Sequence, residues 1–267
     1  MKTKQKQNNR ILNCLPSKDV QNDFSFKDAM VTGFVKAVSI PASIDLRENW
    51  WQVNNQGSTG SCVGWAVADS LLRWYFVNNQ FIAHDELLSV RFIWMASKET
   101  DVFTERPTTF IEESGTSLKA ALDIARKYGC VKDSDLSFNS RLMYDGDENT
   151  FYAMASRFKI ANYFNLVNGI TDRVNTWKNW IADGNGPILV RLDVDSTWDY
   201  ATDTNGNLDT YDPGSARGGH AVAIVGYTED RLIIRNSWDD TWGDGGFAYA
   251  SFSYAENAFT EAYGVTI

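Results

Sequence analysis

The chain has 267 residues, of which 43% are hydrophobic and 13% aromatic, and its formal net charge is −9. This composition excludes a disordered polypeptide, and the length suffices for one large core or for two half-domains that share a cleft. The negative charge repels phosphate and anionic lipid, so we expect neither nucleic acid nor a membrane surface as a partner.

The N-terminal part of the chain differs from the rest. Residues 1–10 are basic and polar, and a single apolar pair, Ile11-Leu12, follows them. A signal peptide would continue with an apolar stretch of about 7–15 residues. No apolar run approaches the roughly 20 residues that span a bilayer. We therefore expect a cytoplasmic or non-classically exported protein, in which residues 1–40 are an N-terminal extension to a domain of residues 41–267.

Four segments have the apolar spacing of helices. The first is apolar on most of its faces, which predicts a buried helix. The second begins with two acidic side chains, and the third and fourth are each followed by a glycine. These residues favour a helix start and a helix end, respectively. The predicted helices are 61–76, 85–97, 117–128 and 172–183.

The C-terminal part of the chain changes to strand patterns. A continuous apolar run is followed across a short turn by a second one, which predicts a hairpin. A helical half of about 41–155 before a mainly β half of 156–267 predicts an α+β fold of two subdomains with a cleft between them. The predicted strands are 187–192, 221–227, 231–235, 246–252 and 262–267.

Three cysteines are present, Cys14, Cys62 and Cys130. This odd, small number does not form a disulfide framework, and most such cysteines are small buried hydrophobic residues. Cys62 differs because it lies at the start of the predicted buried helix, directly after the glycine-containing segment 56–61. A helix N-terminus lowers the pKa of a thiol, and the thiolate is the nucleophilic form. Cys62 is therefore a candidate nucleophile, although an inert buried cysteine fits the same position when it is considered alone.

A thiol nucleophile requires a base, and the chain has only two histidines, His84 and His220. His84 precedes the acidic start of a predicted helix, which favours a surface or capping role. His220 opens a buried strand after a glycine pair that leaves room for a substrate backbone. The predicted hairpin brings Asn236 close to His220, where it can fix the imidazole tautomer and Trp238 can cover their hydrogen bond. Each feature alone also fits a structural role.

Four segments that contain these residues resemble the papain/cathepsin family of cysteine peptidases. The first is similar to the start of the mature family domain, and the others are similar to its active-site blocks in the same order. The family signature C-G-[SA]-C-[WY] reads Thr59-Gly60-Ser61-Cys62-Val63 here. Thr59 replaces a cysteine that forms a disulfide in many relatives, and these departures resemble disulfide-poor bacterial members. The matching segments are 41–47, 55–62, 219–227 and 234–238, with Trp242-Gly243.

The resemblance implies a papain-like fold, with a helical N-terminal half, a β-barrel-like C-terminal half and the active site between them. It also implies the catalytic roles: Cys62 is the nucleophile, His220 the base and Asn236 the group that orients it. Gln56, with the Cys62 backbone N–H, donates to the oxyanion. The implied activity is hydrolysis of peptide bonds in a peptide or protein substrate through an acyl-enzyme, with no cofactor and no metal. We expect a monomer.

A further set of residues is expected to line the substrate cleft. By resemblance, Gly115 and its neighbours hydrogen-bond to an extended substrate backbone. A residue of the last strand forms the floor of the main specificity pocket in relatives, and alignment from the C-terminus places Thr260 or Glu261 there. An inward-pointing Glu261 predicts that a basic side chain is accepted two residues before the cleaved bond. The substrate-binding residues expected are Gly115, Thr116, Gly219, Trp238 and Glu261.

Two other functions remain open from the sequence. A catalytically silent binding protein can have the same fold, because fold does not imply function. A thiol-dependent acyl transferase or ligase uses the same cysteine and histidine as a peptidase.

Residues 1–40 are too short for the helical pro-region that family zymogens carry. They can nevertheless lie across the cleft as an intramolecular inhibitory segment, ordered around Leu15, Pro16, Phe24 and Phe26. The two phenylalanines face one side if the chain is extended. A tethered segment blocks a site effectively even when its own contacts are weak. The alternative is a structural strap far from the site, and the sequence does not decide between the two.

Overall fold

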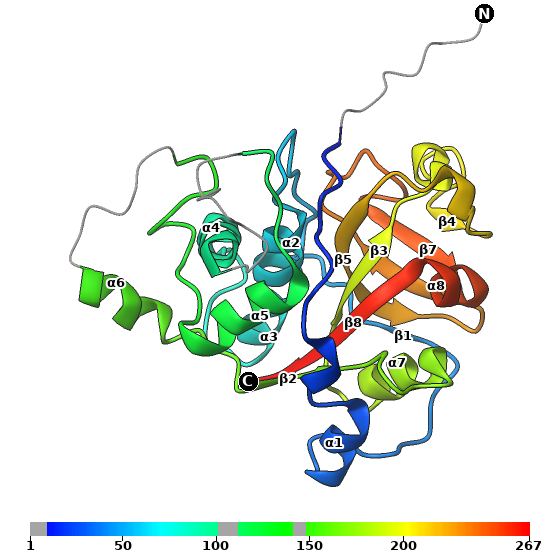
Figure 1. The fold of residues 1–267 in the computed structure, drawn as a ribbon, viewed down its shortest axis with the longest axis horizontal. Helices are drawn as coiled ribbons and strands as arrows, with labels where there is room; N and C mark the ends of the chain where they lie inside the picture. Colours follow the sequence, from blue (N-terminus) through cyan, green and yellow to red (C-terminus); the bar gives the residue numbers. More distant parts are fainter. Residues whose placement is uncertain (1–9, 101–111, 141–147) are drawn as a thin grey trace, which may run out of the picture.

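A computed structural model describes residues 10–100, 112–140 and 148–267 of the chain. Figure 1 shows two halves side by side, one of helices and one built on a twisted sheet. The start of the described chain, in dark blue, runs down between them in this view. The fold is therefore the predicted α+β arrangement of a helical half followed by a mainly β half.

The central element of the helical half is a long buried helix that begins at Cys62. It consists of α2 (Cys62–Gly64), a π-helical stretch η2 (Trp65–Leu72) and α3 (Arg73–Asn78). Every residue of α2 and η2 is buried. The helix carries apolar side chains on most of its faces, so it is stable only when it is packed on most sides, as the sequence predicts. The neighbouring helices are α4 (Val90–Thr100), α5 (Leu118–Lys127) and α6 (Glu148–Ala155).

Helix α4 starts later than the sequence predicts. The acidic residues expected in its first turn precede it, and the Glu86 carboxylate accepts the Ala83 N–H at 2.8 Å. Ser89 instead caps the helix, because its Oγ accepts the Phe92 N–H at 3.0 Å. The predicted start at residue 85 is wrong, since a serine cap rather than the acidic pair defines the N-terminus at Val90.

Helices α5 and α7 (Arg173–Ala182) agree with the predicted segments. The side chains of Ser117 and Asp172 cap their N-termini. Beyond their C-termini, Gly129 and Gly184 have φ angles of 95° and 82°, which a residue with a Cβ adopts only with strain.

The β half is built on an eight-stranded sheet in the order β2-β8-β3-β5-β6-β7-β4, with β1 paired to β5. Neighbouring strands are antiparallel except for β4 and β7. Strands β3, β5, β6, β7 and β8 match the predicted ones, whereas β1, β2, β4 and helix α8 lie outside the predicted elements. In the part of the chain that the structure describes, β2 and β4 do not pair with each other, so the sheet is open where a barrel-like half was expected. The bounds are β1 (Ile44–Asp45), β2 (Asn162–Asn165), β3 (Ile188–Asp193), β4 (Asn207–Leu208), β5 (Gly219–Tyr227), β6 (Arg231–Arg235), β7 (Phe247–Ser251), α8 (Phe252–Ala258) and β8 (Phe259–Thr266).

Hydrophobic cores lie on both faces of the sheet. One packs against the long buried helix, and the other packs against α7 and α8. Neighbouring residues of β5 contribute to different cores, Ala221 to the first and Val222 to the second. Because β5 is buried on both faces, its sequence is a continuous apolar run instead of an alternating one.

The N-terminal extension divides into two parts. Residues 10–17 lie between the two halves (Figure 1). The following part contains η1 (Val20–Asn22) and α1 (Phe26–Val31), and it packs on the β half, where Ala29 and Val35 join the core. The extension therefore combines a segment in the cleft with a structural strap, the two alternatives that the sequence left open.

The two phenylalanines of this strap are not arranged as predicted. Ser25 forms a capping box with Asp28, which makes Phe26 the first residue of a helix. Phe24 precedes the cap and is 58% exposed. The expected extended chain is wrong, because the capping box was not recognised.

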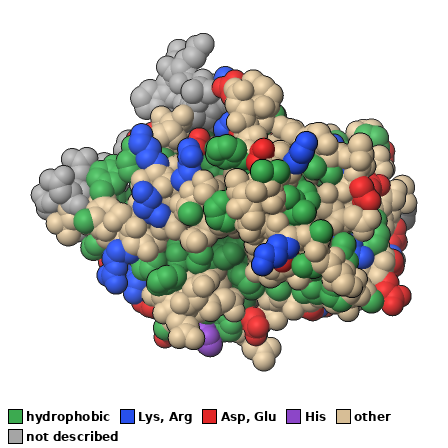
Figure 2. Space-filling view, turned by 90° about the horizontal axis from the view of Figure 1, so that it is seen from below, with side chains coloured by type: hydrophobic (Ala, Val, Ile, Leu, Met, Phe, Trp, Pro, Cys, Tyr) green, Lys and Arg blue, Asp and Glu red, His purple; other side chains and the backbone are tan. Residues whose placement is uncertain are grey.

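Figure 2 shows the face of the molecule seen from below Figure 1, on which acidic and basic side chains are interspersed with hydrophobic and neutral ones. Basic side chains are more frequent on the left of this face and acidic ones on the right. Within the described residues, no helix combines the length and the apolar character that crossing a membrane requires.

Candidate active site

Cys62 is fully buried at the first position of α2. The loop before it passes close to another segment, since a Cβ on Gly60 would stand 2.6 Å from the Glu113 carbonyl oxygen. Two residues further along the helix, a Cβ on Gly64 would stand 2.8 Å from the Val90 carbonyl oxygen. Glycines at these positions let the start of the helix lie between two neighbouring segments and so fix the place of the thiol.

His220 and Asn236 meet across the predicted hairpin. His220 lies at the start of β5, Asn236 directly follows β6, and the His220 Nε2 is 2.7 Å from the Asn236 Oδ1. The Trp238 ring covers this pair, 4.8 Å from the imidazole, and Trp198 meets the imidazole edge-on at 5.6 Å. Both His220 and Asn236 are buried, so their hydrogen bond is shielded from water.

The pKa of the Cys62 thiol lies well below its ordinary value. The largest cause is a hydrogen bond from the Cys14 thiol. Burial acts in the opposite direction, but the hydrogen bond and charge of His220 and the backbone N–H of Ala221 also lower the pKa. Among the described residues, the His220 Nδ1 has no hydrogen-bond partner, and His220 acts on the Cys62 thiol as one of the causes of its lowered pKa. Thiol and imidazole therefore face each other where the helical half meets the sheet.

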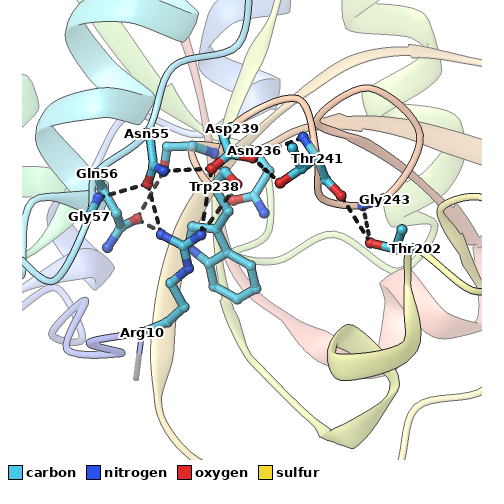
Figure 3. Close-up of polar contacts among 11 residues, drawn as sticks. Arg10, Asn55, Gln56, Gly57, Thr202, Asn236, Trp238, Asp239, Thr241 and Gly243 are labelled. Carbon is cyan, nitrogen blue, oxygen red and sulfur yellow. Dashed lines mark hydrogen bonds and ion pairs between the residues drawn. The ribbon is translucent and has the colours of Figure 1, made fainter. Parts of the chain in front are cut away.

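Gln56 is buried beside Trp238 (Figure 3). Its Oε1 accepts the Ser237 Oγ–H at 2.9 Å and the Trp238 Nε1–H at 3.2 Å. Its Nε2 donates to the Thr59 carbonyl at 3.0 Å. These contacts hold the amide nitrogen toward the loop that leads to Cys62, and an amide nitrogen has a second hydrogen for another acceptor.

The N-terminal segment passes over this site, a feature that the sequence left as one of two alternatives. The Cys14 N–H donates to the Gly219 carbonyl at 2.9 Å, on the β side of the cleft. The Leu15 N–H donates to the Thr116 carbonyl at 3.0 Å, on the helical side. Thus Gly219 and Thr116, both predicted to bind substrate, bind the chain's own N-terminal segment.

Two predicted cleft glycines make room for this segment. A Cβ on Gly115 would collide with the Asn13 carbonyl, and a Cβ on Gly219 would collide with the Cys14 carbonyl. Both positions have ordinary φ angles, so it is the close approach of another backbone that requires glycine there.

Arg10 anchors the other end of the segment (Figure 3). Its guanidinium lies 5.6 Å from the Trp238 ring and donates to the Asn55 Oδ1 at 2.8 Å. The Asn55 side chain in turn donates to Asp239 at 2.6 Å. Trp238, which was predicted to bind substrate, is therefore covered by Arg10, and the Trp238 ring packs against the His220 imidazole.

The sheet beneath the segment carries two opposite charges. Arg191 and Glu261 face each other in the register of β3 and β8. The Arg191 Nε donates to the Cys14 carbonyl at 3.0 Å, and the Glu261 Oε1 accepts the Ser17 N–H at 2.8 Å. Burial raises the pKa of Glu261, whose Oε2 has no partner among the described residues. Glu261 thus lies beneath the N-terminal segment. Sequence reasoning did not single out Arg191, although a charged residue in an apolar strand was a signal for it.

A buried clamp of Asp69, Arg73 and Arg235 joins the two halves behind the site. Asp69 contacts Arg73 at 3.1 Å on the long helix and Arg235 at 2.7 Å on β6. Arg235 immediately precedes Asn236 and also donates to the Ser70 Oγ at 2.6 Å. Sequence reasoning missed this clamp, although charged residues within a helix and a strand that are otherwise apolar were a signal for it.

The remaining cysteine and histidine lie in other contacts. Cys130 is buried, and its thiol faces the carbonyls of Ser89 and Val131. His84 stacks on Trp50, with ring centres 5.5 Å apart. Across residues 10–100, 112–140 and 148–267, no three His, Cys, Asp or Glu side chains gather as a metal site requires.

Comparisons with known proteins agree with this arrangement. Residues 40–263 match the family described as papain family cysteine protease. The chain is 26% identical over 221 residues to Peptidase 1 of Psoroptes ovis, covering 80% of this chain and 62% of that protein. It is 27% identical over 227 residues to Macrodontain-1 of Ananas macrodontes, covering 78% of this chain and 88% of that protein. The chain thus spans less than two thirds of the length of the mite peptidase.

Solved structures show the same fold. Xylellain, a cysteine protease from Xylella fastidiosa, superposes with a TM-score of 0.74 at 19% identity, covering 97% of this chain and 96% of that one. The digestive procathepsin L2 proteinase from the larval midgut of Tenebrio molitor has a TM-score of 0.69 at 20% identity, covering 100% of this chain and 81% of that one.

Proposed function

Because this chain belongs to the papain family of cysteine proteases, we propose that it hydrolyses peptide bonds through a thioester formed on Cys62. The observation that carries the proposal is the set of contacts from Cys62 to His220 and from His220 to Asn236, the latter at 2.7 Å. A lowered thiol pKa beside an oriented imidazole is the requirement for thiolate attack on a carbonyl carbon.

The catalytic steps follow from these positions. The Cys62 thiolate, whose proton His220 holds, attacks the carbonyl carbon, and the oxyanion accepts hydrogen bonds from the Gln56 Nε2 and the Cys62 backbone N–H. His220 gives that proton to the leaving amine as the C–N bond breaks, and the thioester remains. His220 then takes a proton from water, whose oxygen attacks the thioester and releases the Cys62 thiolate, so the starting pair of thiolate and protonated imidazole is restored. Asn236 holds the imidazole throughout, because its Oδ1 fixes the other ring nitrogen.

The N-terminal segment is proposed to inhibit this activity. Its backbone occupies the hydrogen-bonding groups at Gly219 and Thr116 that an extended substrate would use. Substrate must therefore displace residues 10–17, whose effective concentration at the cleft is high because they are tethered through the strap. The structures of pro-forms among the solved neighbours are consistent with such a segment.

A basic side chain is the proposed preference two residues before the cleaved bond. Glu261 lies beneath the segment, and its Oε2, which has no partner among the described residues, can accept from an arginine or lysine of a substrate. Arg191 is already held by Thr260 at 2.7 Å and Asp193 at 3.0 Å, so it does not neutralise Glu261 completely.

The test compares Cys62→Ala with Cys130→Ala, a matched change of a second buried cysteine. Hydrolysis of a fluorogenic peptide is measured on reduced protein, for the full chain and for a chain that begins at Lys18. Cys62→Ala should lose activity by at least about 10³-fold, as for removal of other catalytic nucleophiles. Cys130→Ala should stay close to wild type. Residual activity of Cys62→Ala within tenfold of wild type would refute the proposal, and products that require an added amine would indicate acyl transfer instead.

A further inference from the structure

We propose that Cys14 and Cys62 form a reversible disulfide, which ties the N-terminal segment to the nucleophile and locks the cleft. This inference rests on the proposed function of Cys62 and adds a covalent modification site to it. The proposal requires that two thiols be held together, that they differ in reactivity, and that an oxidant can convert them.

The first requirement is met by the way in which Cys14 is fixed. Its N–H donates to the Gly219 carbonyl at 2.9 Å, and its carbonyl accepts from the Arg191 Nε at 3.0 Å. With both backbone groups held by the β half, Cys14 is buried in the same core as Cys62, and the interaction of the two thiols shifts the pKa of each. The two cysteines are 2% and 0% exposed, so the pair is enclosed by the segment itself.

The second requirement concerns their acidities. Contact with the Cys14 thiol and with His220 lowers the pKa of Cys62, whereas burial and the proximity of Cys62 raise the pKa of Cys14. Cys62 therefore carries the thiolate, which is the form that oxidants attack, and Cys14 keeps its proton. Cys130 lies in other contacts, and burial raises its pKa well above the ordinary range. It is the internal control that should not react.

The third requirement is met by a peroxide, which we name as the oxidant and which reaches the enclosed pair when the segment moves out of the cleft, as it also must for a substrate. The Cys62 thiolate attacks one peroxide oxygen, the O–O bond breaks, and Cys62 becomes a sulfenic acid while hydroxide leaves and takes a proton from solvent. The Cys14 sulfur then attacks the Cys62 sulfur and displaces its hydroxyl group, which leaves as water with the Cys14 proton. In total, two thiols lose two electrons and two protons, and hydrogen peroxide is reduced to two molecules of water.

The bond would change the state of the enzyme in two ways. It removes the nucleophile and prevents the segment from leaving the cleft, so that inhibition becomes covalent. It also intercepts the sulfenic acid before a second oxidant converts it irreversibly to sulfinic acid, and a thiol reductant then restores both groups.

The direct experiment uses the full chain as it is. Reduced protein is treated with one equivalent of hydrogen peroxide, its free thiols are blocked with iodoacetamide, and it is digested with trypsin without reduction. The sequence places the three cysteines in separate tryptic peptides, 11–18, 48–73 and 128–132. Mass spectrometry should find the first two peptides linked and the third alkylated. Cys62 as sulfinic acid with Cys14 alkylated, or any link to Cys130, would overturn the proposal.

Activity with Cys14→Ser supplies the second readout. After an excess of peroxide, wild type should lose at least about tenfold in peptidase activity and recover it with dithiothreitol, because the product is a disulfide. Cys14→Ser should lose activity without recovery, because its Cys62 proceeds to sulfinic acid. Equal recovery in both proteins would contradict the proposal.

Failure of this inference is distinguishable from failure of the proposed function. If reduced wild type cleaves no peptide but the linked peptides form, the disulfide stands and the peptidase assignment falls. If reduced wild type is active and no link forms, the peptidase assignment stands and the disulfide proposal falls.

Discussion

Two connections cross from the helical half to the β half beside the active site, and they differ in kind. The buried clamp joins the long helix to β6 through charged side chains, with Asp69 3% and Arg235 1% exposed. Residues 10–17 join the same halves across the cleft through backbone hydrogen bonds of Cys14 and Leu15 and through side-chain contacts, and Pro16 within them is exposed.

The active site depends on these two connections to different degrees. Cys62 is held by the start of its helix and His220 by its own strand and Asn236, and neither depends on the segment for its place. The clamp fixes those two elements relative to each other, whereas the segment only covers them. We therefore expect the clamp to be permanent and the segment to be removable.

The largest expected effect comes from breaking the clamp. Asp69→Asn leaves Arg73 and Arg235 buried without their carboxylate, which should cost about 3–5 kcal/mol in the free energy of unfolding. Urea denaturation of wild type and variant measures this. The control is Asp230→Asn, whose side chain is 72% exposed beside Arg231 and which should unfold close to wild type. Equal small changes in both variants would show that the clamp does not hold the halves together.

Removing the segment should raise the peptidase activity and leave the stability nearly unchanged. A chain that begins at Lys18 should gain several-fold in kcat/KM, because the tethered segment competes with substrate at a roughly millimolar effective concentration. Its melting temperature should stay near that of the full chain. A chain that begins at Ser39 should instead melt earlier, because it lacks the core residues Ala29 and Val35. Unchanged kcat/KM in the first chain would mean that residues 10–17 do not inhibit.

A more limited effect concerns the cleft floor beneath the segment. Glu261→Gln in the chain that begins at Lys18 should reduce the preference for arginine over leucine, two residues before the cleaved bond, by about tenfold. A tenfold change corresponds to about 1.5 kcal/mol, which is the lower end of the range for a hydrogen bond to a charged group. A fluorogenic peptide panel measures it. A wild-type protein that accepts only bulky apolar side chains there would contradict the assignment of Glu261.

The smallest effect is a change in the pH dependence of the thiolate. Because the pKa of Cys62 is lowered, its thiolate should persist as the pH falls below the ordinary thiol range and disappear only below the lowered value. Cys14→Ala removes the largest cause of the lowering, so the pKa of Cys62 should rise while His220 still holds it below that of Cys130. Ultraviolet thiolate absorbance against pH measures both. An unchanged titration in Cys14→Ala would mean that the two thiols do not share a proton.

The sequence predicted the fold, and it singled out the candidate catalytic residues, because their signals are local. Glycines before a buried helix and a histidine opening an apolar strand are visible within short segments, and a short turn determines that Asn236 returns to His220. The same reasoning placed Gly115 and Gly219 in the cleft, where close contact with another backbone now explains them.

The features that the sequence did not predict depend on contacts between residues far apart in the chain. Asp69 and Arg235 are 166 residues apart, and no local pattern pairs them. The contact of Cys14 with Cys62 follows from the path of the extension through the cleft, which backbone hydrogen bonds to Gly219 and Thr116 determine. The open sheet and the short strands β1, β2 and β4 likewise depend on pairing and not on apolar patterns, since β1 and β4 are only two residues long.

Covalent labelling of the reduced protein with an epoxysuccinyl inhibitor, followed by peptide mapping, tests the proposed nucleophile and its covering segment together. We expect a single adduct, on Cys62 in peptide 48–73, that forms faster in the chain beginning at Lys18 than in the full chain. An adduct on Cys14 or Cys130, or equal labelling rates in the two chains, would contradict a Cys62 nucleophile that the N-terminal segment covers.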